Sequence, residues 1–282
     1  METFQHKIVP RDRLIDLRLR EIWQYRDLLY LFVRRDFVAK YKQTILGPLW
    51  FFVTPLLQTV VYSFVFGTIA ELPTSGLPSA LFYLSGITCW SYFSICLTST
   101  SNTFTANASI FGKVYFPRAV TPISIVISNL IQFAVKLLLF LGMMAFYVSK
   151  GASFPIGLDL LFLPLLVLLM GMMGLGFGMI ISSMTTKYRD MNNLIVFGTQ
   201  LLMYATPVIY PLDLIEEKSP KMGWLITYNP MSSIIEAFRH MFLGTSSMHW
   251  DLLLYSSIVT VVVFLLGLIV FNRTEKNFMD TV

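Results

Sequence analysis

Charged residues are scarce along most of this 282-residue chain and make up only 13% of it. Soluble globular domains carry about a quarter charged residues, so the composition excludes an ordinary soluble protein. Ten of the 21 lysines and arginines lie within residues 1–44, and most of the remaining chain consists of apolar runs. These runs have about 20 residues or more, the length that crosses a bilayer. The sequence therefore predicts an integral membrane protein with a basic cytoplasmic start.

Cysteine is nearly absent, and so is the signature of a secreted protein. Cys89 and Cys96 lie in one apolar run. On a helix they would be two turns apart, beyond the reach of a disulfide, so we expect free thiols packed in the membrane. The first 20 residues are charged throughout and contain no apolar segment, so no signal peptide is expected.

Motifs for covalent, metal or nucleotide chemistry are missing too. The histidines His6, His240 and His249 lack the HExxH spacing of zinc sites, and neither a GxSxG nor a GxxxxGK[ST] motif occurs. We therefore expect a protein that is not an enzyme and holds no metal or cofactor. The apolar runs hold no carboxylate away from their ends, which argues against coupling to protons or sodium. Any transport against a gradient would then need an external motor.

Hydropathy predicts an all-α integral membrane protein with six membrane-spanning helices. The predicted spans are residues 45–70, 79–101, 120–148, 157–183, 191–211 and 251–271. With the N-terminus inside, the inside segments hold sixteen lysines and arginines and the outside segments four. This asymmetry satisfies the positive-inside rule, so both termini are predicted to face the cytoplasm. Because the positive charge lies beside the predicted spans, it is better explained by orientation of the chain in the membrane and by partner docking than by nucleic-acid binding.

Residues 25–42 are predicted to form an amphipathic helix in the membrane surface. Leu29, Phe32, Val33 and Phe37 recur at helical spacing, and most charged residues fall elsewhere. Such a helix is either a plain lipid anchor or a docking surface for a cytoplasmic partner. The pattern itself is compatible with both.

Residues 212–250 must lie outside if the neighbouring spans cross the membrane. Two apolar stretches in this region are too short to cross, and prolines and Gly244 break them into two short helices. They are predicted to be re-entrant. Glu236, Arg239 and His240 stand at i, i+3 and i+4, so they share a helix face. They are either an ion pair that fixes this helix to its neighbour or a polar lining at the outer mouth of a conduit.

Two of the predicted spans have an unusual composition. The stretch GMMGLGFGM, at residues 171–179, predicts close packing between helices. The span at 79–101 is rich in serine and threonine, which either bond to neighbouring backbone or face an aqueous passage. Lys136 is the sole charge well inside a span.

Three segments resemble the permeases of the ABC transporter type-2 family, specifically its polysaccharide exporters. The first is RRDFVAKYKQTILGPLWFFVTP, at the entry to the first span. The second is NASIFGKVYFPRAVTP, between the second and third spans, and the third is NPMSSIIEAFRHMFLG, which begins at Asn229. They occur in the family's order and cover nearly the whole chain.

The resemblance implies a homodimer that pairs with two copies of a separate ATPase, on which ATP and magnesium would be bound. Residues 1–44 would be a cytoplasmic segment, and residues 45–282 the permease domain, with an outer gate region at 212–250. The implied ATPase-coupling residues are Arg34, Arg35, Asp36, Asn107, Lys113, Phe116, Pro117, Arg118, Arg189 and Asp190. The implied outer-gate residues are Asn229, Pro230, Glu236, Arg239 and His240.

A conduit for a lipid-linked polysaccharide needs weak, repeated contacts with sugar faces, and aromatic rings supply them. The candidate channel residues are Phe52, Tyr62, Phe66, Tyr83, Trp90, Tyr204 and Tyr210. Ordinary packing or an aromatic belt at the membrane interface is the alternative for each ring.

The function that the resemblance implies is ATP-powered export of a lipid-linked polysaccharide, in the first place O-antigen, across the bacterial inner membrane. Capsule or teichoic acid is an alternative cargo, as is a drug or a simple lipid. A membrane anchor or assembly scaffold without transport is an alternative of a different class.

Overall fold

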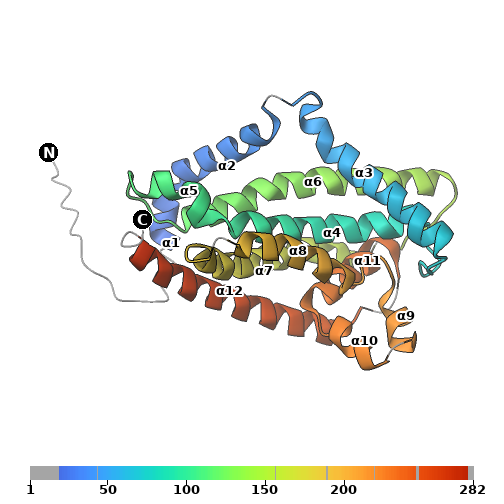
Figure 1. Ribbon diagram of the computed structural model, residues 1–282. Helices are drawn as coiled ribbons and strands as arrows, with labels where there is room; N and C mark the ends of the chain where they lie inside the picture. Colours follow the sequence, from blue (N-terminus) through green and yellow to red (C-terminus); the bar gives the residue numbers. More distant parts are fainter. Residues whose placement is uncertain are drawn as a thin grey trace.

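The computed structural model describes residues 19–42, 44–155, 157–188, 190–218, 220–245 and 248–278. Within these residues all regular secondary structure is helical, as predicted. The helices form an elongated bundle (Figure 1). The N-terminal helices and the end of the last helix gather at one end, which we call the terminal end. Three short helices from residues 212–243 lie at the opposite end, which we call the far end.

Five helical segments are long and apolar enough to cross a membrane, so the multi-pass prediction is confirmed. At a rise of about 1.5 Å per residue, some 20 residues cross a hydrocarbon core of about 30 Å. The helices are α3 (Trp50–Tyr62), α4 (Ser79–Thr100), α6 (Val120–Ser149), α7 (Leu163–Thr185) and α12 (Trp250–Phe278). A 3₁₀ turn, Gly47–Leu49, precedes α3, and a π-helical stretch, Ser63–Ile69, extends it; the 3₁₀ turn Leu158–Phe162 precedes α7.

The span predicted at 191–211 is a shorter helix, α8 (Met191–Tyr204), so the count of six spans is not confirmed. Its 14 residues rise about 21 Å, which is less than the hydrocarbon thickness. Residues 205–211 follow as turns, and Pro207 and Pro211 lie among them. Proline lacks a backbone N–H and cannot continue a helix ladder, which explains the early end.

The most buried of the five long helices is α4, which packs against α6 on one side and α7 on another, while α12 packs on α7. Glycines permit this close approach. A Cβ at Gly174 would lie 2.9 Å from the carbonyl oxygen of Phe93 in α4, and one at Gly176 would lie 2.9 Å from the backbone of Phe264 in α12. The predicted close-packing role of the glycine run is confirmed on both faces of α7.

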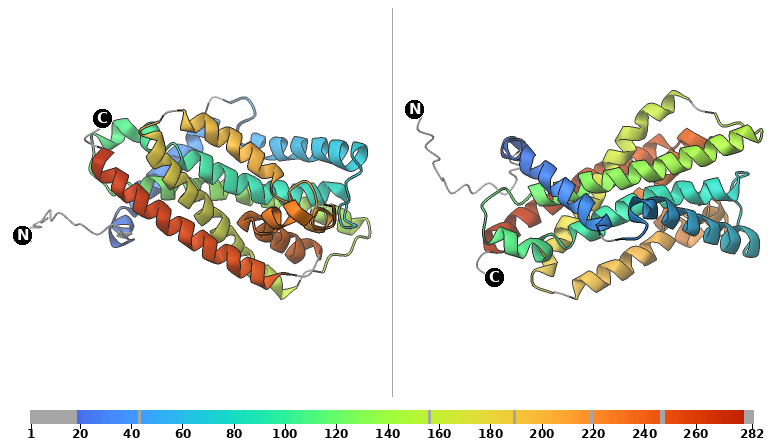
Figure 2. Two further views of the ribbon diagram at one scale, coloured as in Figure 1. Left: turned by 60° about the horizontal axis from the view of Figure 1, so that its bottom comes forward. Right: turned by 90° about the horizontal axis from the view of Figure 1, so that it is seen from above.

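The amphipathic helix predicted at 25–42 is α2 (Arg26–Tyr41), preceded by the short α1 (Leu19–Gln24). It crosses the bundle obliquely, as Figure 2 shows. Phe32 is buried, and Leu29, Val33 and Phe37 are partly buried, so the predicted apolar face is confirmed. That face packs against protein, mainly α6, where Ser128 Oγ donates to Val33 O at 3.4 Å. Its position at a membrane surface stays a prediction.

The far end contains α9 (Leu212–Lys218), α10 (Pro220–Thr227) and α11 (Pro230–Leu243), one short helix more than predicted. The expected breaks are confirmed, because α10 and α11 begin at prolines and Gly244 follows α11. The extra helix, α9, includes the charged residues Asp213, Glu216, Glu217 and Lys218, so the hydropathy of the sequence does not indicate it. Entry of these helices into the membrane stays a prediction.

Candidate functional site

The N-terminal end of α11 is held by one side chain that bonds in two directions. Asn229 caps the helix, and its Oδ1 accepts the backbone N–H of Met231 at 3.1 Å. Pro230 occupies the first turn, where no intrahelical donor is needed. The Asn229 amide also donates to Ala205 O at 2.9 Å and to Thr206 Oγ1 at 3.0 Å. Asn229 therefore joins the start of α11 to the turn that follows α8.

The C-terminal end of α11 is shaped by Gly244. Its φ of 69° is left-handed, and its N–H donates to His240 O at 3.0 Å. A Cβ here would also collide with the ring of Pro155. His240 lies at this end, with Nδ1 3.3 Å from Thr245 O and Nε2 3.8 Å from Asp159 Oδ2. It is thus oriented toward the loop before α7, away from the pair formed by the other two predicted gate residues.

Arg239 is completely buried, and all five of its N–H groups find acceptors. The donor–acceptor distances are 3.2 Å from Nε to Ser85 Oγ, 2.6 Å from Nη1 to Pro207 O, 3.1 Å from Nη1 to Glu236 Oε1, 3.4 Å from Nη2 to Phe82 O and 2.9 Å from Nη2 to Val208 O. The acceptors belong to α4, to the turn after α8 and to α11 itself. One guanidinium thereby fastens three parts of the far end together.

This geometry supports the ion-pair alternative for Glu236 and Arg239 over a polar lining at a conduit mouth. The Arg239 guanidinium also lies over the Phe82 ring, 3.7 Å from its centre. Gly86 leaves the space it occupies, since a Cβ there would lie 3.0 Å from Arg239 Nη2 and 2.9 Å from Val208 O. We call this arrangement the Arg239 clamp.

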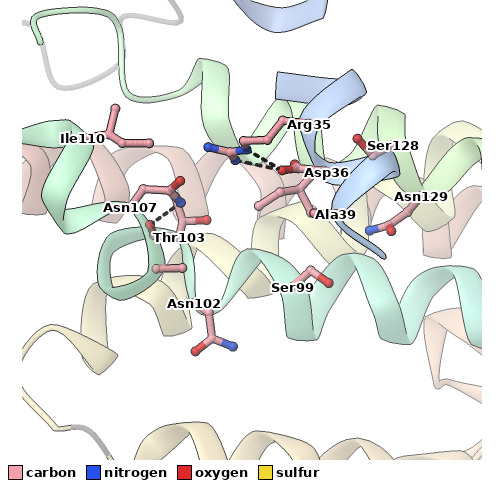
Figure 3. A pocket seen from close by; sticks show the side chains of 12 residues that line it. Arg35, Asp36, Ala39, Ser99, Asn102, Thr103, Asn107, Ile110, Ser128 and Asn129 are labelled. Atoms are coloured by element: carbon pink, nitrogen blue, oxygen red, sulfur yellow. Dashed lines mark hydrogen bonds and ion pairs between the residues drawn. The ribbon is translucent and has the colours of Figure 1, made fainter. Parts of the chain in front are cut away.

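At the terminal end, α2, α5 (Thr103–Phe111) and the first part of α6 border an open cleft of about 400 Å³ (Figure 3). Arg35 and Asp36 enter it from α2, with Arg35 Nη2 2.8 Å from Asp36 Oδ1. Asn107 enters from α5, and its amide donates to Thr103 O at 2.9 Å. Three predicted coupling residues therefore meet in one polar cleft. The other lining residues are Ala39, Ser99, Asn102, Thr103, Ala106, Ile110, Ile125, Ser128 and Asn129.

Aromatic contacts connect this cleft to the loop between α5 and α6. The Arg35 guanidinium lies 4.6 Å from the centre of the Phe32 ring, and that ring meets Phe116 edge-on at 5.6 Å. Arg118 follows in the same loop and donates from Nη1 to Glu275 O in α12 at 2.9 Å. Partial burial lowers the pKa of Arg118 and the charge of Glu275 opposes this, but the guanidinium remains charged at neutral pH. The loop thus contacts both the N-terminal and the C-terminal helices.

The other predicted coupling residues do not join the cleft. Arg34 and Lys113 are exposed, Pro117 is buried beside Phe116, and Asp190 precedes α8. Arg189 lies outside the described residues.

A second groove, of about 360 Å³, runs over α4 between α3, α6 and α8. Two predicted channel residues line it, Tyr62 from α3 and Trp90 from α4. Lys136 from α6 lines it as well. The remaining lining residues are Gln58, Ile87, Ser91, Ser94, Ile95, Thr98 and Met203. We call it the middle groove.

The other candidate channel aromatics lie elsewhere. Tyr83 is fully buried, and its ring packs against Tyr62 and Phe66 with centres 6.3 and 6.5 Å apart. Phe52 lines a separate groove against α6. Tyr204 is exposed on α8, and its carbonyl accepts the Tyr210 hydroxyl at 2.6 Å. Within the part of the chain that the structure describes, these seven rings therefore do not form one stripe.

The sequence contained signals for residues that were not assigned to a site. Lys136 stood out as an isolated charge, and the span at 79–101 as rich in hydroxyls. Their meeting in one groove depends on how α4 and α6 are rotated against each other, which helical spacing within one span does not specify.

Comparison with known proteins gives the following matches. The model of the family described as ABC-2 type transporter matches residues 27–243. An O-antigen export system permease protein RfbA from Klebsiella pneumoniae is 30% identical over 258 residues, which cover 90% of this chain and 94% of that protein. A protein of the same name from Myxococcus xanthus is 28% identical over 264 residues, which cover 94% of this chain and 98% of that protein.

Proposed function

This chain belongs to the ABC-2 type transporter family, and from that premise we propose that it is the permease subunit of an exporter of lipid-linked polysaccharide, O-antigen in the first place. The observation that carries the proposal is the similarity to O-antigen export permeases over nine-tenths of the chain and almost all of each relative. The family supplies the membrane passage, so the chain is a transport subunit and a separate ATPase supplies the energy.

The middle groove supports a role as one wall of the conduit. It combines aromatic rings with hydroxyl and amide groups, which suits the apolar faces and hydroxyls of sugars. It is bordered by α3 on one side and α8 on another, so one chain forms only part of an enclosure. A second copy placed across α3 and α8 would close it. This arrangement supports a homodimer in which the polymer passes between the two copies.

The terminal-end cleft supports a role in coupling to the ATPase. The charged pair Arg35–Asp36 is partly exposed there, and Phe32 connects it to Phe116 in the loop between α5 and α6. A partner that moves α2 would therefore also exert a force on this loop. Through the bond from Arg118 to Glu275 O, the force would reach the end of α12. In the proposed cycle, ATP closes the ATPase dimer, α2 shifts, the two permease copies part along α3 and α8, and the polymer advances.

From the positive-inside rule we expect the terminal end to face the cytoplasm and the far end to lie outside the bacterial inner membrane. The Arg239 clamp would then hold the outer end of the conduit closed in the resting state. Its role is to fix α11 against α4, and substrate need not touch it.

The proposed function is tested by association and by surface glycans. The full chain is expressed together with its candidate ATPase partner, and we expect the two to purify together. A strain lacking this gene is expected to lose its surface polysaccharide and to regain it when the gene is restored. The proposal is wrong if the ATPase never associates and the deletion strain still displays the glycan.

A further inference from the structure

The end of α3 is wound differently from the rest of that helix. Residues Ser63–Ile69 form a π-helical stretch, and the Ala70 N–H that follows donates to Val65 O, five residues back, at 2.9 Å. Such bonds skip one residue more than those of an α-helix, so the stretch holds a surplus residue. π-helical stretches are rare and are frequent at functional sites. This one leads through a short loop into α4 (Figure 1).

The hydroxyl groups of α3 follow the same change of winding. In the α-helical part, Thr59 Oγ1 donates to Pro55 O, four residues back, at 2.7 Å. In the π-helical part, Thr68 Oγ1 reaches Ser63 O, five residues back, at 3.4 Å. The Ser63 hydroxyl, where the winding changes, has no hydrogen-bond partner among the described residues. Backbone and side chains thus mark the same boundary within one helix.

The π-helical stretch covers a buried tyrosine of α4. The ring of Tyr83 lies 6.5 Å from that of Phe66 and 6.3 Å from that of Tyr62, centre to centre. Tyr83 is fully buried, and its hydroxyl has no hydrogen-bond partner within the part of the chain that the structure describes. Burying a polar group without a partner costs free energy. Costly arrangements of this kind are typical of switch regions, in which the structure has a second arrangement.

Tyr83 adjoins the Arg239 clamp through the residue that precedes it. The rings of Phe82 and Tyr83 meet edge-on, with centres 5.5 Å apart. The Phe82 ring lies 3.7 Å from the Arg239 guanidinium, and Phe82 O accepts from Arg239 Nη2 at 3.4 Å. Contacts therefore run from Phe66 on α3 through two residues of α4 to the clamp. A change in the winding of α3 would reach Arg239 along this path.

We propose that the stretch Ser63–Ile69 is a two-state element that controls the Arg239 clamp. In the state described here it is π-helical and covers Tyr83. In the second state it is α-helical, and the surplus residue passes into the loop before α4. This change turns Phe66 away from Tyr83, gives the Tyr83 hydroxyl access to water and loosens the clamp. The role of the element in export rests on the proposed function, whereas the change of winding does not.

Deletions of one residue test whether the stretch holds a surplus residue. Deletion of Val65, which is exposed, should let the stretch close with α-helical bonds while both flanks keep their places. The purified full chain in micelles should then unfold within about 8 °C of the wild type. Deletion of the exposed Val60 in the α-helical part turns all later residues of α3 by about 100°. It should cost at least twice that shift or leave no folded protein, and equal shifts would contradict the surplus residue.

The native Cys89 reports the state of the clamp when Cys96→Ala leaves it as the single thiol. Cys89 is fully buried on α4 and within electrostatic reach of Arg239, so N-ethylmaleimide should modify it slowly. A minor state typically makes up about 0.1–10% of the molecules, so deletion of Val65, which imposes the second state, should raise the rate at least about tenfold. An unchanged rate would overturn the proposal. Cys96 in a Cys89→Ala variant is the matched control, and a rise at both thiols would indicate general loosening and contradict the proposal.

Tyr83→Phe tests the cost of the hydroxyl without a partner. The substitution removes this cost from the π-helical state, so in the Cys96→Ala background the modification of Cys89 should slow about fivefold. Tyr62→Phe is the matched control from the same ring cluster, because the Tyr62 hydroxyl donates to Met203 Sδ at 3.8 Å. It should not slow the reaction. A wild-type rate in Tyr83→Phe, or slowing in both variants, would contradict the role of the Tyr83 hydroxyl.

Surface glycan display in cells, at equal membrane levels of the variants, connects the element to export. Deletion of Val65 imposes one state and Tyr83→Phe favours the other. Both should therefore lose most of the display, although they change the Cys89 rate in opposite directions. Normal display in both variants, together with changed Cys89 rates, would contradict the role in export. If the wild-type gene itself does not restore display, the proposed function fails, and the Cys89 rates still decide whether α3 changes its winding.

Discussion

The far end buries its cation, Arg239, completely, whereas the middle groove leaves its cation, Lys136, partly exposed. Arg239 has an acceptor for every N–H group, including Glu236, and its surroundings leave no room for a ligand. Lys136 borders an open groove in which none of the described lining residues is acidic. A cation whose N–H groups are all bonded within its own chain stabilises the fold, because removing it would leave buried acceptors without a hydrogen-bond donor. The comparison therefore sets a cation whose donors are all filled by its own fold beside a cation that lines an open groove.

The largest effect on stability is expected for Arg239→Met, which removes every donor of the clamp. Three backbone carbonyls and the Glu236 carboxylate would remain buried without it, and the free energy of unfolding should fall by about 3–5 kcal/mol. Equilibrium unfolding in mixed micelles measures this. The matched control is Arg26→Met at an exposed position of α2, which should cost less than about 0.5 kcal/mol. Equal stability of the two variants would show that the clamp is not structural.

Gly86→Ala tests whether the Arg239 clamp tolerates one added methyl group between α4 and the turn after α8. The added Cβ would lie 2.9 Å from Val208 O and 3.0 Å from Arg239 Nη2, so we expect a loss of about 1–3 kcal/mol. Gly142→Ala is the control, because its Cβ meets nothing within 4 Å and a helix interior gains about 0.5–1 kcal/mol from this change. Opposite signs in thermal unfolding would sharpen the contrast between the tightly packed far end and the uncrowded position of Gly142 on α6.

Two substitutions of Asn229 separate its role as a helix cap from its amide hydrogen bonds to the turn after α8. Asn229→Ala should cost about 1–2 kcal/mol, since it removes both. Asn229→Asp keeps the oxygen that accepts from Met231 but loses the amide that donates to Ala205 O. Its loss of stability should lie between those of wild type and Asn229→Ala. An aspartate variant as unstable as the alanine variant would assign the whole effect to the hydrogen bonds that the Asn229 amide donates to the turn after α8.

The sequence predicted those features of the fold that depend on the residues of a single helix. Composition and run length identified five membrane-length helices, and Pro230 and Gly244 marked both ends of α11. The prediction of six spans was not confirmed, because α8 ends after Tyr204 and the next carbonyls serve Asn229 and Arg239 instead of a helix ladder. These bonds join residues more than 20 positions apart, so no local pattern announces them.

The candidate sites were predictable in part for the same reason. Arg35, Asp36 and Asn107 were assigned to coupling by resemblance, and they do line one cleft. The gate residues were placed on one face by their spacing, but His240 is oriented toward Asp159, because a face that spans i to i+4 still turns through an arc. Which of these side chains is buried depends on the neighbouring helices that pack against each part of that arc, and the sequence of α11 alone does not specify them.

The smallest effect on stability, and the sharpest on transport, is expected for Arg35→Gln. Its partner Asp36 is adjacent in sequence and the pair is partly exposed, so unfolding should change by less than about 0.5 kcal/mol. Export should nevertheless fall while the partner ATPase continues to hydrolyse ATP, because the cleft would no longer transmit the movement of α2. Glycan display and ATP hydrolysis of the purified complex are measured together, with Arg26→Gln as the control on the same helix. Arg118→Gln should behave like Arg35→Gln, since it breaks the bond to Glu275 O at the other end of the same chain of contacts. Unchanged export in both variants would remove the terminal-end cleft from the coupling path.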